Sequence, residues 1–160
     1  MKSERVNKMS APIPPFQTVT KTIIKSKQIY APVGPYSQAI LANNSTLYIS
    51  GVLGLDKEAQ VVCGGVEAQT RQALENLERV LEAGGASLES VVKTTILLVD
   101  MNDFRCVNQV YAEYFKKYAP ARATYQVAKL PLGAAVEIEA IALSGKLVVS
   151  EIGPCPCTRA

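Results

Sequence analysis

The sequence predicts a single α+β domain in which one mixed β-sheet carries two helices on one of its faces. The first observation is the order of its periodic segments, which is strand, strand, helix, strand, helix, strand, strand. The second is its length, because 160 residues suit one domain and are ample for a hydrophobic core. The third is its composition, since 48% apolar and 19% charged residues are typical of globular proteins.

Five segments have the β-branched and apolar composition of strands. Residues 91–99 are nearly all apolar, so this strand should be buried. A proline- and glycine-bearing segment joins the first two strands, and a turn at residues 131–133 separates the last two. The expected strands are residues 19–26, 46–51, 91–99, 123–130 and 135–143.

Two further segments have apolar residues at the spacing of one helical face. The first covers residues 67–83 and lies between two glycine pairs, of which the second supplies a C-terminal cap. The second follows Asn102 or Asp103 as its N-cap. The apolar stripes are Ala73, Leu74, Leu77, Val80 and Leu81 in the first helix, and Phe104, Val107, Val110, Tyr111, Tyr114, Phe115 and Tyr118 in the second.

The face of the sheet without helices must meet water or another subunit. Several strand positions that would lie there are apolar, which favours contact with another subunit. No stretch approaches the roughly 18 uninterrupted apolar residues of a membrane helix, so we expect no membrane partner.

The two ends of the chain differ from the middle in composition. We expect a flexible N-terminal extension (1–18), a folded domain (19–150) and a flexible C-terminal tail (151–160). Residues 1–30 contain six basic residues and one acid, a charge of +5, which leaves −2 for the remainder of the +3 chain. This distribution argues against nucleic acid as a partner of the domain. A basic N-terminus leaves a mitochondrial transit peptide as the alternative to a cytoplasmic protein.

The chain contains no histidine. This absence excludes Ser-His-Asp and Cys-His nucleophilic systems, histidine metal sites and paired-histidine ribonuclease chemistry. The cysteines Cys63, Cys106, Cys155 and Cys157 lack zinc spacing, so we expect no metal, and free thiols in a reducing compartment. Any chemistry must use carboxylates, Arg, Lys, Tyr, Thr, Cys or backbone amides.

Arg122 immediately precedes the fourth expected strand, in the first half of which polar side chains recur at every second position. Because side chains alternate along a strand, Arg122, Thr124 and Gln126 share one face. Arginine binds a planar carboxylate through two parallel, charge-assisted hydrogen bonds. The alternative is a solvated arginine at a strand edge, since exposed charges are the norm.

Two carboxylates interrupt the last apolar strand. Glu137 and Glu139 lie on the same face, roughly 7 Å apart along the strand. A carboxylate in such an apolar run destabilises the fold unless it is paired with another group or serves in catalysis. In catalysis it could act as a general base toward water, or as an acid if burial raises its pKa. The alternative to a functional role, above all for Glu139, is that this segment is an edge strand with one face exposed to solvent.

Two loop features add candidate binding groups. Tyr36 lies on a segment stiffened by two prolines and a glycine, where it closes a pocket or serves as a packing residue. Ser50 and Gly51 end a strand, and glycine there permits close approach of a ligand to the backbone.

The motifs that contain these residues resemble those of the RidA (YjgF) family. They follow the family's order and spacing from about residue 21 to residue 143, which is nearly the whole domain. The blocks that carry the resemblance are APVGPYSQA, YISG, VVKTTILLVDMNDF, VNQVY, PARATYQVAKLP and VEIEAIA.

The resemblance implies a chorismate-mutase-like fold assembled as a homotrimer, with a central β-barrel and three clefts between subunits. It implies a 2-iminobutanoate/2-iminopropanoate deaminase that needs neither metal nor organic cofactor. Such an enzyme hydrolyses reactive 2-imino acids, formed from enamines, to 2-oxo acids and ammonia.

The family's site residues match positions of this sequence one by one. The carboxylate-binding arginine matches Arg122, and the water-activating glutamate matches Glu137. The implied substrate-binding residues are Tyr36, Ser50, Gly51, Asn108 and Thr124. Many relatives carry cysteine where Thr124 stands, so covalent thiol chemistry is excluded there, and glutamine where Val52 stands, which alters the polarity of the pocket.

Two other functions remain open at this point. The family is also associated with RNA cleavage and inhibition of translation, although the charge of residues 31–160 and the lack of histidine argue against an endoribonuclease. A noncatalytic metabolite-binding or chaperone-like role is the second alternative. The presence of Arg122 favours an enzyme, because deaminase activity is doubtful in branches of the family that lack it.

Overall fold

A computed structural model of the chain describes residues 18–151. The expected N-terminal extension and C-terminal tail, with Cys155 and Cys157, therefore lie almost wholly outside the described residues. Cys63 and Cys106 are free thiols. None of the helices between residues 18 and 151 is both long and apolar enough to cross a membrane.

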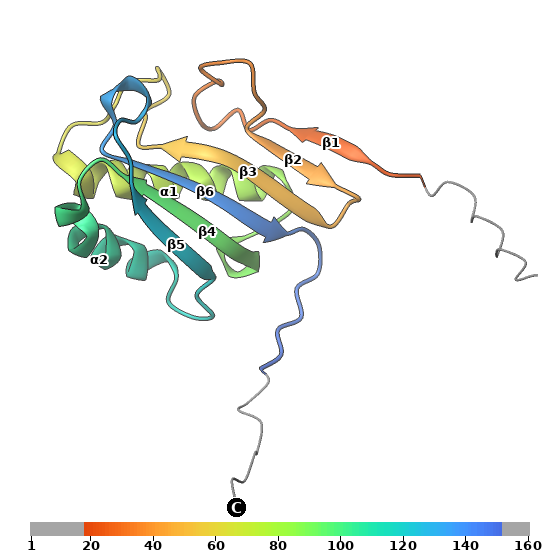
Figure 1. The fold of residues 1–160 in the computed structure, drawn as a ribbon. Helices are drawn as coiled ribbons and strands as arrows, with labels where there is room; N and C mark the ends of the chain where they lie inside the picture. The colour runs from red at the N-terminus through yellow and green to blue at the C-terminus, as the bar shows by residue number, and fades with distance from the viewer. Residues whose placement is uncertain (1–17, 152–160) are drawn as a thin grey trace, which may run out of the picture.

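One six-stranded sheet forms the centre of the fold (Figure 1). Its strands follow the spatial order β1-β2-β3-β6-β4-β5. Neighbouring strands are antiparallel except β4 and β5, which are parallel, so the predicted mixed sheet is confirmed. The strands are β1 (Lys21–Ile24), β2 (Ala39–Ala42), β3 (Thr46–Leu53), β4 (Val91–Leu98), β5 (Ala121–Gln126) and β6 (Val136–Leu143).

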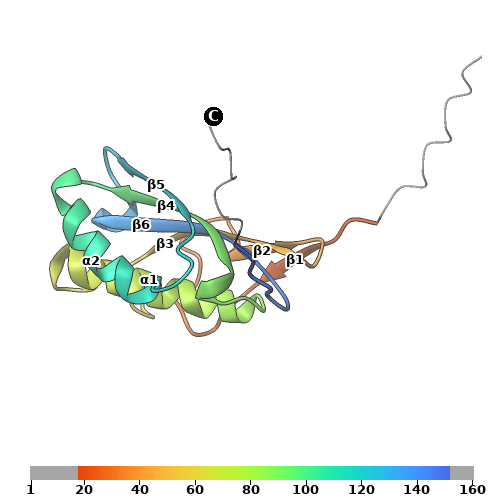
Figure 2. The same ribbon diagram turned by 90° about the horizontal axis from the view of Figure 1, so that it is seen from below.

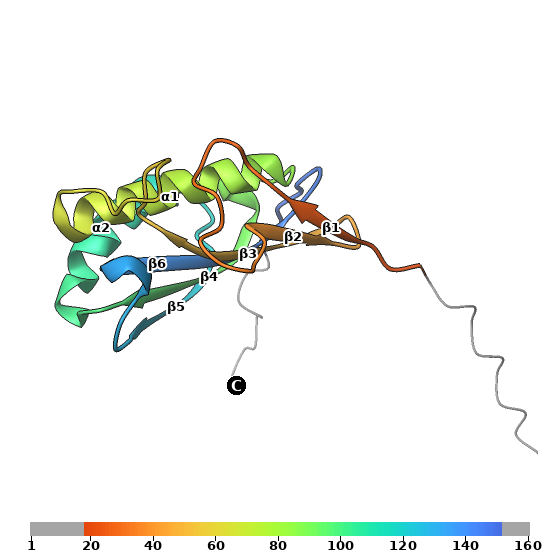
Figure 3. The ribbon, with the colours of Figure 1, turned by 90° about the horizontal axis from the view of Figure 1, so that it is seen from above.

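Two α-helices, α1 (Gly65–Ala83) and α2 (Phe104–Tyr114), pack on the same face of this sheet, as predicted (Figures 2 and 3). The predicted apolar stripe of α1 is fully buried against β3 and β6. Along β6 the side chains alternate, and Val136, Ile138 and Ala140 are buried beneath the helices. Three short 3₁₀ turns complete the connections, η1 (Leu88–Ser90), η2 (Met101–Asp103) and η3 (Pro131–Gly133).

The strand β2 is absent from the sequence prediction, which placed these residues in the connecting segment. Its four residues, AILA, are too few for a periodic signal. The overlooked signal is the pair Asn43 and Asn44, with φ of 49° and 53°, because a tight hairpin needs positive φ at both central residues.

Two predicted boundaries are wrong. The strand predicted as 123–130 occupies Ala121–Gln126, because its parallel partner β4 ends at Leu98, the register partner of Gln126. Helix α2 ends at Tyr114, so Tyr118, with φ 53° and 43% exposure, does not belong to its buried stripe.

The start of α2 agrees with the prediction in position and differs in chemistry. Asp103 is the N-cap residue of α2, yet its side chain makes no capping hydrogen bond. The capping carboxylate belongs to Asp100, which accepts from the backbone N–H of Asn102 at 2.8 Å at the start of the preceding 3₁₀ turn.

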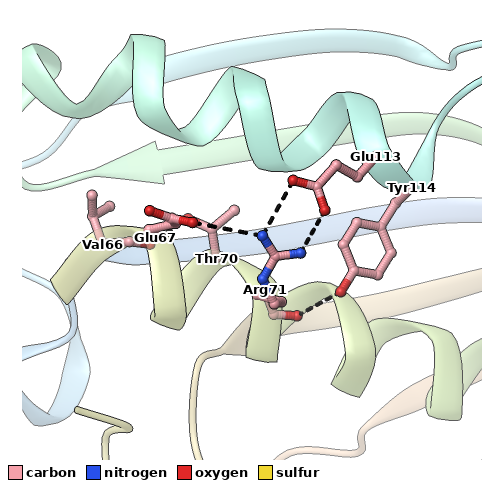
Figure 4. Close-up of polar contacts among 6 residues, drawn as sticks. All are labelled: Val66, Glu67, Thr70, Arg71, Glu113 and Tyr114. Carbon is pink, nitrogen blue, oxygen red and sulfur yellow. Dashed lines mark hydrogen bonds and ion pairs between the residues drawn. The ribbon is translucent and has the colours of Figure 1, made fainter. Parts of the chain in front are cut away.

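The two helices are joined by polar contacts on their outer side (Figure 4). The Arg71 guanidinium donates to both carboxylate oxygens of Glu113, at 2.6 and 3.2 Å. Glu67 lies 3.7 Å from the same guanidinium, one helical turn away on α1. Because these groups are largely exposed, the pairs contribute little stability and mainly orient α2 on α1.

Asn76 is the polar side chain that ties α1 to the sheet. It is buried, and its Nδ2 donates to the carbonyl oxygens of Leu53 and Leu55 at 3.1 and 2.9 Å. Buried acceptors that lose their donor cost about 1–3 kcal/mol. Asn76 therefore fixes the end of β3.

We expect Asn76→Ala to lower the free energy of unfolding by about 1–3 kcal/mol, because two buried carbonyl groups lose their donor. Urea titration at matched protein concentration measures this change. Glu75→Ala, at an exposed position of the same helix, is the control and should change stability by less than about 0.5 kcal/mol. Equal losses in both variants would contradict the role of Asn76.

Candidate active site

The carboxylate of Glu137 lies next to an irregularity in β3. Ile49 pairs with Ala140 and Val52 with Ile138, so β3 contains one residue more than β6 over this stretch. The extra residue is a β-bulge at Ser50 and Gly51. The bulge turns this part of β3 toward Glu137, on the face of the sheet that lacks helices.

Gly51 is required by its distance from Glu137. A Cβ atom built on Gly51 would overlap the Glu137 carboxylate, with the carboxyl carbon only 2.6 Å away. Any side chain at position 51 would therefore displace the carboxylate from its place. Gly51 was predicted as a substrate-binding residue. The structure gives it a steric reason to be glycine, namely the lack of space beside Glu137, rather than a positive φ.

The loop between β1 and β2 is held against the bulge by hydrogen bonds. Gln38 is buried, and its Nε2 donates to the carbonyl of Tyr30 at 2.9 Å while its Oε1 accepts from the Ser26 N–H at 2.6 Å. The Ser50 hydroxyl donates to the carbonyl of Ser37 at 2.7 Å. The loop is thus tied at both ends before any ligand binds.

Tyr36 stands on this loop beside the bulge. Its hydroxyl accepts from the Val33 N–H at 3.3 Å, and 42% of the residue is exposed. Together with the bulge and Glu137 it borders a cavity of about 180 Å³. The cavity is lined by Val33, Tyr36, Ser50, Gly51, Leu53, Pro131 and Glu137.

The surroundings of Glu137 favour its protonated form. Burial raises the pKa of Glu137 above its ordinary value, and repulsion from the nearby Glu139 raises it further. No ion pair within residues 18–151 offsets its charge. Such a carboxylate is a stronger base than an exposed glutamate, which suits it to take a proton from water.

Tyr30 supports the same region from beneath. Its buried hydroxyl accepts from the Leu53 N–H at 3.1 Å. Burial raises the pKa of Tyr30 to about 12, an effect only partly offset by this hydrogen bond. The phenol therefore stays neutral, and it holds the strand just after the bulge.

Arg122 lies on β5, on the opposite face of the sheet. Its guanidinium carbon is 4.8 Å from the ring centroid of Tyr111 and 5.7 Å from that of Phe104, both on α2. Among the described residues it forms no ion pair. Its hydrogen-bond donors thus have no internal carboxylate to satisfy them.

Thr124 and Asn108 belong to the same group as Arg122. Thr124 is two residues further along β5, on the same face, and its buried hydroxyl oxygen has no hydrogen-bond partner within the described chain. Asn108 lies on α2, one turn after Phe104 and one turn before Tyr111. The helical spacing places it on the side of α2 that faces Arg122.

The seven predicted site residues therefore form two groups within one chain. Arg122 pairs with Thr94 of β4, whereas Glu137 pairs with Leu97 of the same strand. Thr94 and Leu97 are three residues apart, so they and their partners point to opposite faces. Tyr36, Ser50 and Gly51 lie with Glu137, and Asn108 and Thr124 lie with Arg122. The predicted catalytic pair does not meet in a single chain.

The sequence prediction did not single out four residues that shape these groups. Tyr30 and Gln38 hold the loop beside Glu137, and Phe104 and Tyr111 contact Arg122. The first two carry no local signal, because their partners are 8 to 23 residues away in the chain. The other two were predicted only as apolar stripe residues of α2.

Comparisons with known proteins show which family this chain resembles. A family described as Endoribonuclease L-PSP matches residues 26–144. The chain is 46% identical to human 2-iminobutanoate/2-iminopropanoate deaminase over 86% of this chain and all of the relative. It is 50% identical to the chloroplastic Reactive Intermediate Deaminase A of Arabidopsis thaliana, over 84% of this chain and 76% of the relative.

A solved structure is similar as well. The E. coli protein TdcF with bound serine superposes with a TM-score of 0.72 at 33% identity, over 78% of this chain and 99% of that chain. Since the family match covers most of the chain and the human relative aligns over its whole length, the chain belongs to the Endoribonuclease L-PSP family, the RidA family that its motifs indicated.

Proposed function

We propose that the protein hydrolyses 2-imino acids such as 2-iminobutanoate and 2-iminopropanoate to 2-oxo acids and ammonia. The observation that carries this function is the half-buried Glu137 carboxylate, which has no ion pair within the described part of the chain and opens on a cavity of about 180 Å³. The human and Arabidopsis relatives, both named as deaminases, support the same reaction class. A serine-bound relative supports an amino-acid-like ligand with a carboxylate.

We further propose that three copies of the chain assemble so that Arg122 of one subunit and Glu137 of a neighbouring subunit border the same cleft. Two features favour this assembly. First, each of the two groups of site residues lacks part of what the reaction needs, because the cation Arg122 is in one group and the base Glu137 is in the other. The sheet face opposite the helices exposes large apolar side chains at Tyr48, Tyr125 and Leu143, which a neighbouring subunit would cover.

In this proposal Arg122 holds the substrate carboxylate while Glu137 activates water. The imine reacts as its protonated iminium form: Glu137 takes one proton from water as the water oxygen bonds to the iminium carbon, which gives a neutral carbinolamine. The same carboxyl group then returns the proton to nitrogen. The C–N bond breaks as the C=O bond forms, and ammonium leaves after the last hydroxyl proton passes to it. The iminium is already electrophilic, so positioning and one base suffice.

Thr124 fits this reaction as a binding group rather than a nucleophile. Its hydroxyl oxygen is buried and has no partner among the described residues. A hydroxyl without a neighbouring base is a poor nucleophile, and no histidine exists in the chain to activate it. We propose that it donates a hydrogen bond beside the carboxylate that Arg122 binds.

Replacing Arg122 tests the carboxylate clamp. We expect Arg122→Ala to lower kcat/KM for 2-iminobutanoate by about 100- to 1,000-fold, because a bidentate, charge-assisted contact is lost. The imine is generated in situ by a threonine dehydratase, and 2-oxobutanoate and ammonia release are followed. Arg122→Lys, which keeps the charge without the planar fork, should retain an intermediate rate. No acceleration by the wild-type protein would refute the deaminase function.

The raised pKa of Glu137 predicts a shifted acidic limb in the pH profile. The base form is lost as pH falls through this pKa, so kcat/KM should decline at a pH above the range of an ordinary glutamate. Glu139→Gln removes the second cause of the shift and should move the limb to lower pH. Glu137→Gln should abolish the limb together with most of the activity. An unchanged limb in Glu139→Gln would contradict the electrostatic account.

Mixing two inactive variants tests the shared cleft. Trimers formed from equal amounts of Arg122→Ala and Glu137→Gln chains should regain about one quarter of the wild-type activity, because each head-to-tail interface receives both intact residues in about one of four cases. Isolating the mixed trimers with two affinity tags should raise this to about one third, because one of the three interfaces in each mixed trimer receives both intact residues. If both residues act within one chain, the mixture stays inactive.

A further inference from the structure

Arg122 lies against two aromatic rings of α2 rather than against a carboxylate. Its guanidinium carbon is 4.8 Å from the Tyr111 ring centroid and 5.7 Å from the Phe104 centroid. Both distances fall within the roughly 6 Å over which a ring face attracts a cation. The two residues are seven positions apart, about two helical turns, so both rings lie on one side of α2.

The Tyr111 ring is itself held in place from two directions. Its hydroxyl lies 2.8 Å from the Thr94 hydroxyl in a buried hydrogen bond, and its ring stacks on Phe115 at a centroid distance of 4.3 Å. Thr94 is the register partner of Arg122 across β4 and β5. The strand that aligns Arg122 therefore also fixes the ring beneath it.

Ring contacts position an arginine without using its donors. The rings attract the flat face of the guanidinium, whereas its N–H groups lie in the guanidinium plane and stay available to a carboxylate. A free arginine side chain at a strand edge would lose about 2 kcal/mol of rotamer entropy on binding a ligand. A side chain already held by rings loses less of it at that step.

We propose that Tyr111 and Phe104 are positioning residues that hold Arg122 ready for the substrate carboxylate, an inference that rests on the proposed function. Neither residue needs to touch the substrate. The inference deepens the site by giving an arginine on the edge strand β5, which has no ion pair among residues 18–151, a means of keeping one orientation.

A matched pair of double variants isolates the Tyr111 ring. Thr94→Val with Tyr111→Phe removes both hydroxyls of the buried hydrogen bond and keeps the ring. Thr94→Val with Tyr111→Leu removes the same hydroxyls and also the ring. Removing both partners of a buried hydrogen bond is nearly neutral for stability, so the two variants differ mainly in the face offered to Arg122. Phe104→Leu, at a half-buried position, is a second and independent ring deletion.

Binding of 2-oxobutanoate, measured by calorimetry, is the first readout. The ring-keeping pair should bind within about twofold of the wild-type Kd, and the ring-deleted pair and Phe104→Leu about 3- to 30-fold more weakly. In an Arg122→Ala background, Phe104→Leu should cause no further loss, since it acts through Arg122. An equal further loss there would show a merely structural role and overturn the inference.

The order of the Arg122 side chain is the second readout, and it needs no substrate. The NMR order parameter of the Arg122 Nε–H group should fall in both ring-deleted variants and stay near the wild-type value in the ring-keeping pair. Equal order in all of them would overturn the inference. If the wild-type protein neither binds 2-oxobutanoate nor hydrolyses imines, the proposed function fails, and the order of Arg122 still decides the role of the rings.

Discussion

The alternation of side chains along β4 constrains everything else in this molecule. Thr94 and Leu97 are three residues apart and therefore point to opposite faces of the sheet. Arg122 is aligned with the first and Glu137 with the second, so the cation lies on the face that carries α2 while the carboxylate lies on the face without helices. No rotamer of either side chain carries it through a six-stranded sheet. The two groups therefore do not meet within one chain, which is why the proposed reaction is placed between two copies of the chain.

The Glu137 side of the sheet keeps a carboxylate in a place that disfavours charge. Burial and Glu139 both raise the pKa of Glu137, so ionised Glu137 destabilises the fold above that pKa. The surrounding structure is correspondingly rigid. The lack of a side chain at Gly51 leaves room for the carboxylate, and the Gln38 and Ser50 hydrogen bonds fix the adjoining loop. An unfavourable group held by many favourable contacts is typical of a functional site.

Arg122 is positioned by a different kind of interaction from Glu137. Its charge is positioned by ring faces rather than by an opposite charge, which leaves its donors available. The two groups thus complement each other, since one offers hydrogen-bond donors and a cation and the other offers a base. In the proposed assembly, the apolar open face with Tyr48 and Tyr125 exposed is the surface that a second copy of the chain would cover.

The sequence by itself determined the fold class, both helices and five of the six strands to within about four residues, and it predicted which residues form the candidate site. Apolar periodicity, glycine caps and the alternation along β6 are local, and one sequence displays them directly. Tertiary structure alone decided the strand β2, the end of β5 at Gln126 and the separation of Arg122 from Glu137. These depend on which strands become neighbours and in what register, and such pairings join residues far apart in the chain that no local pattern records.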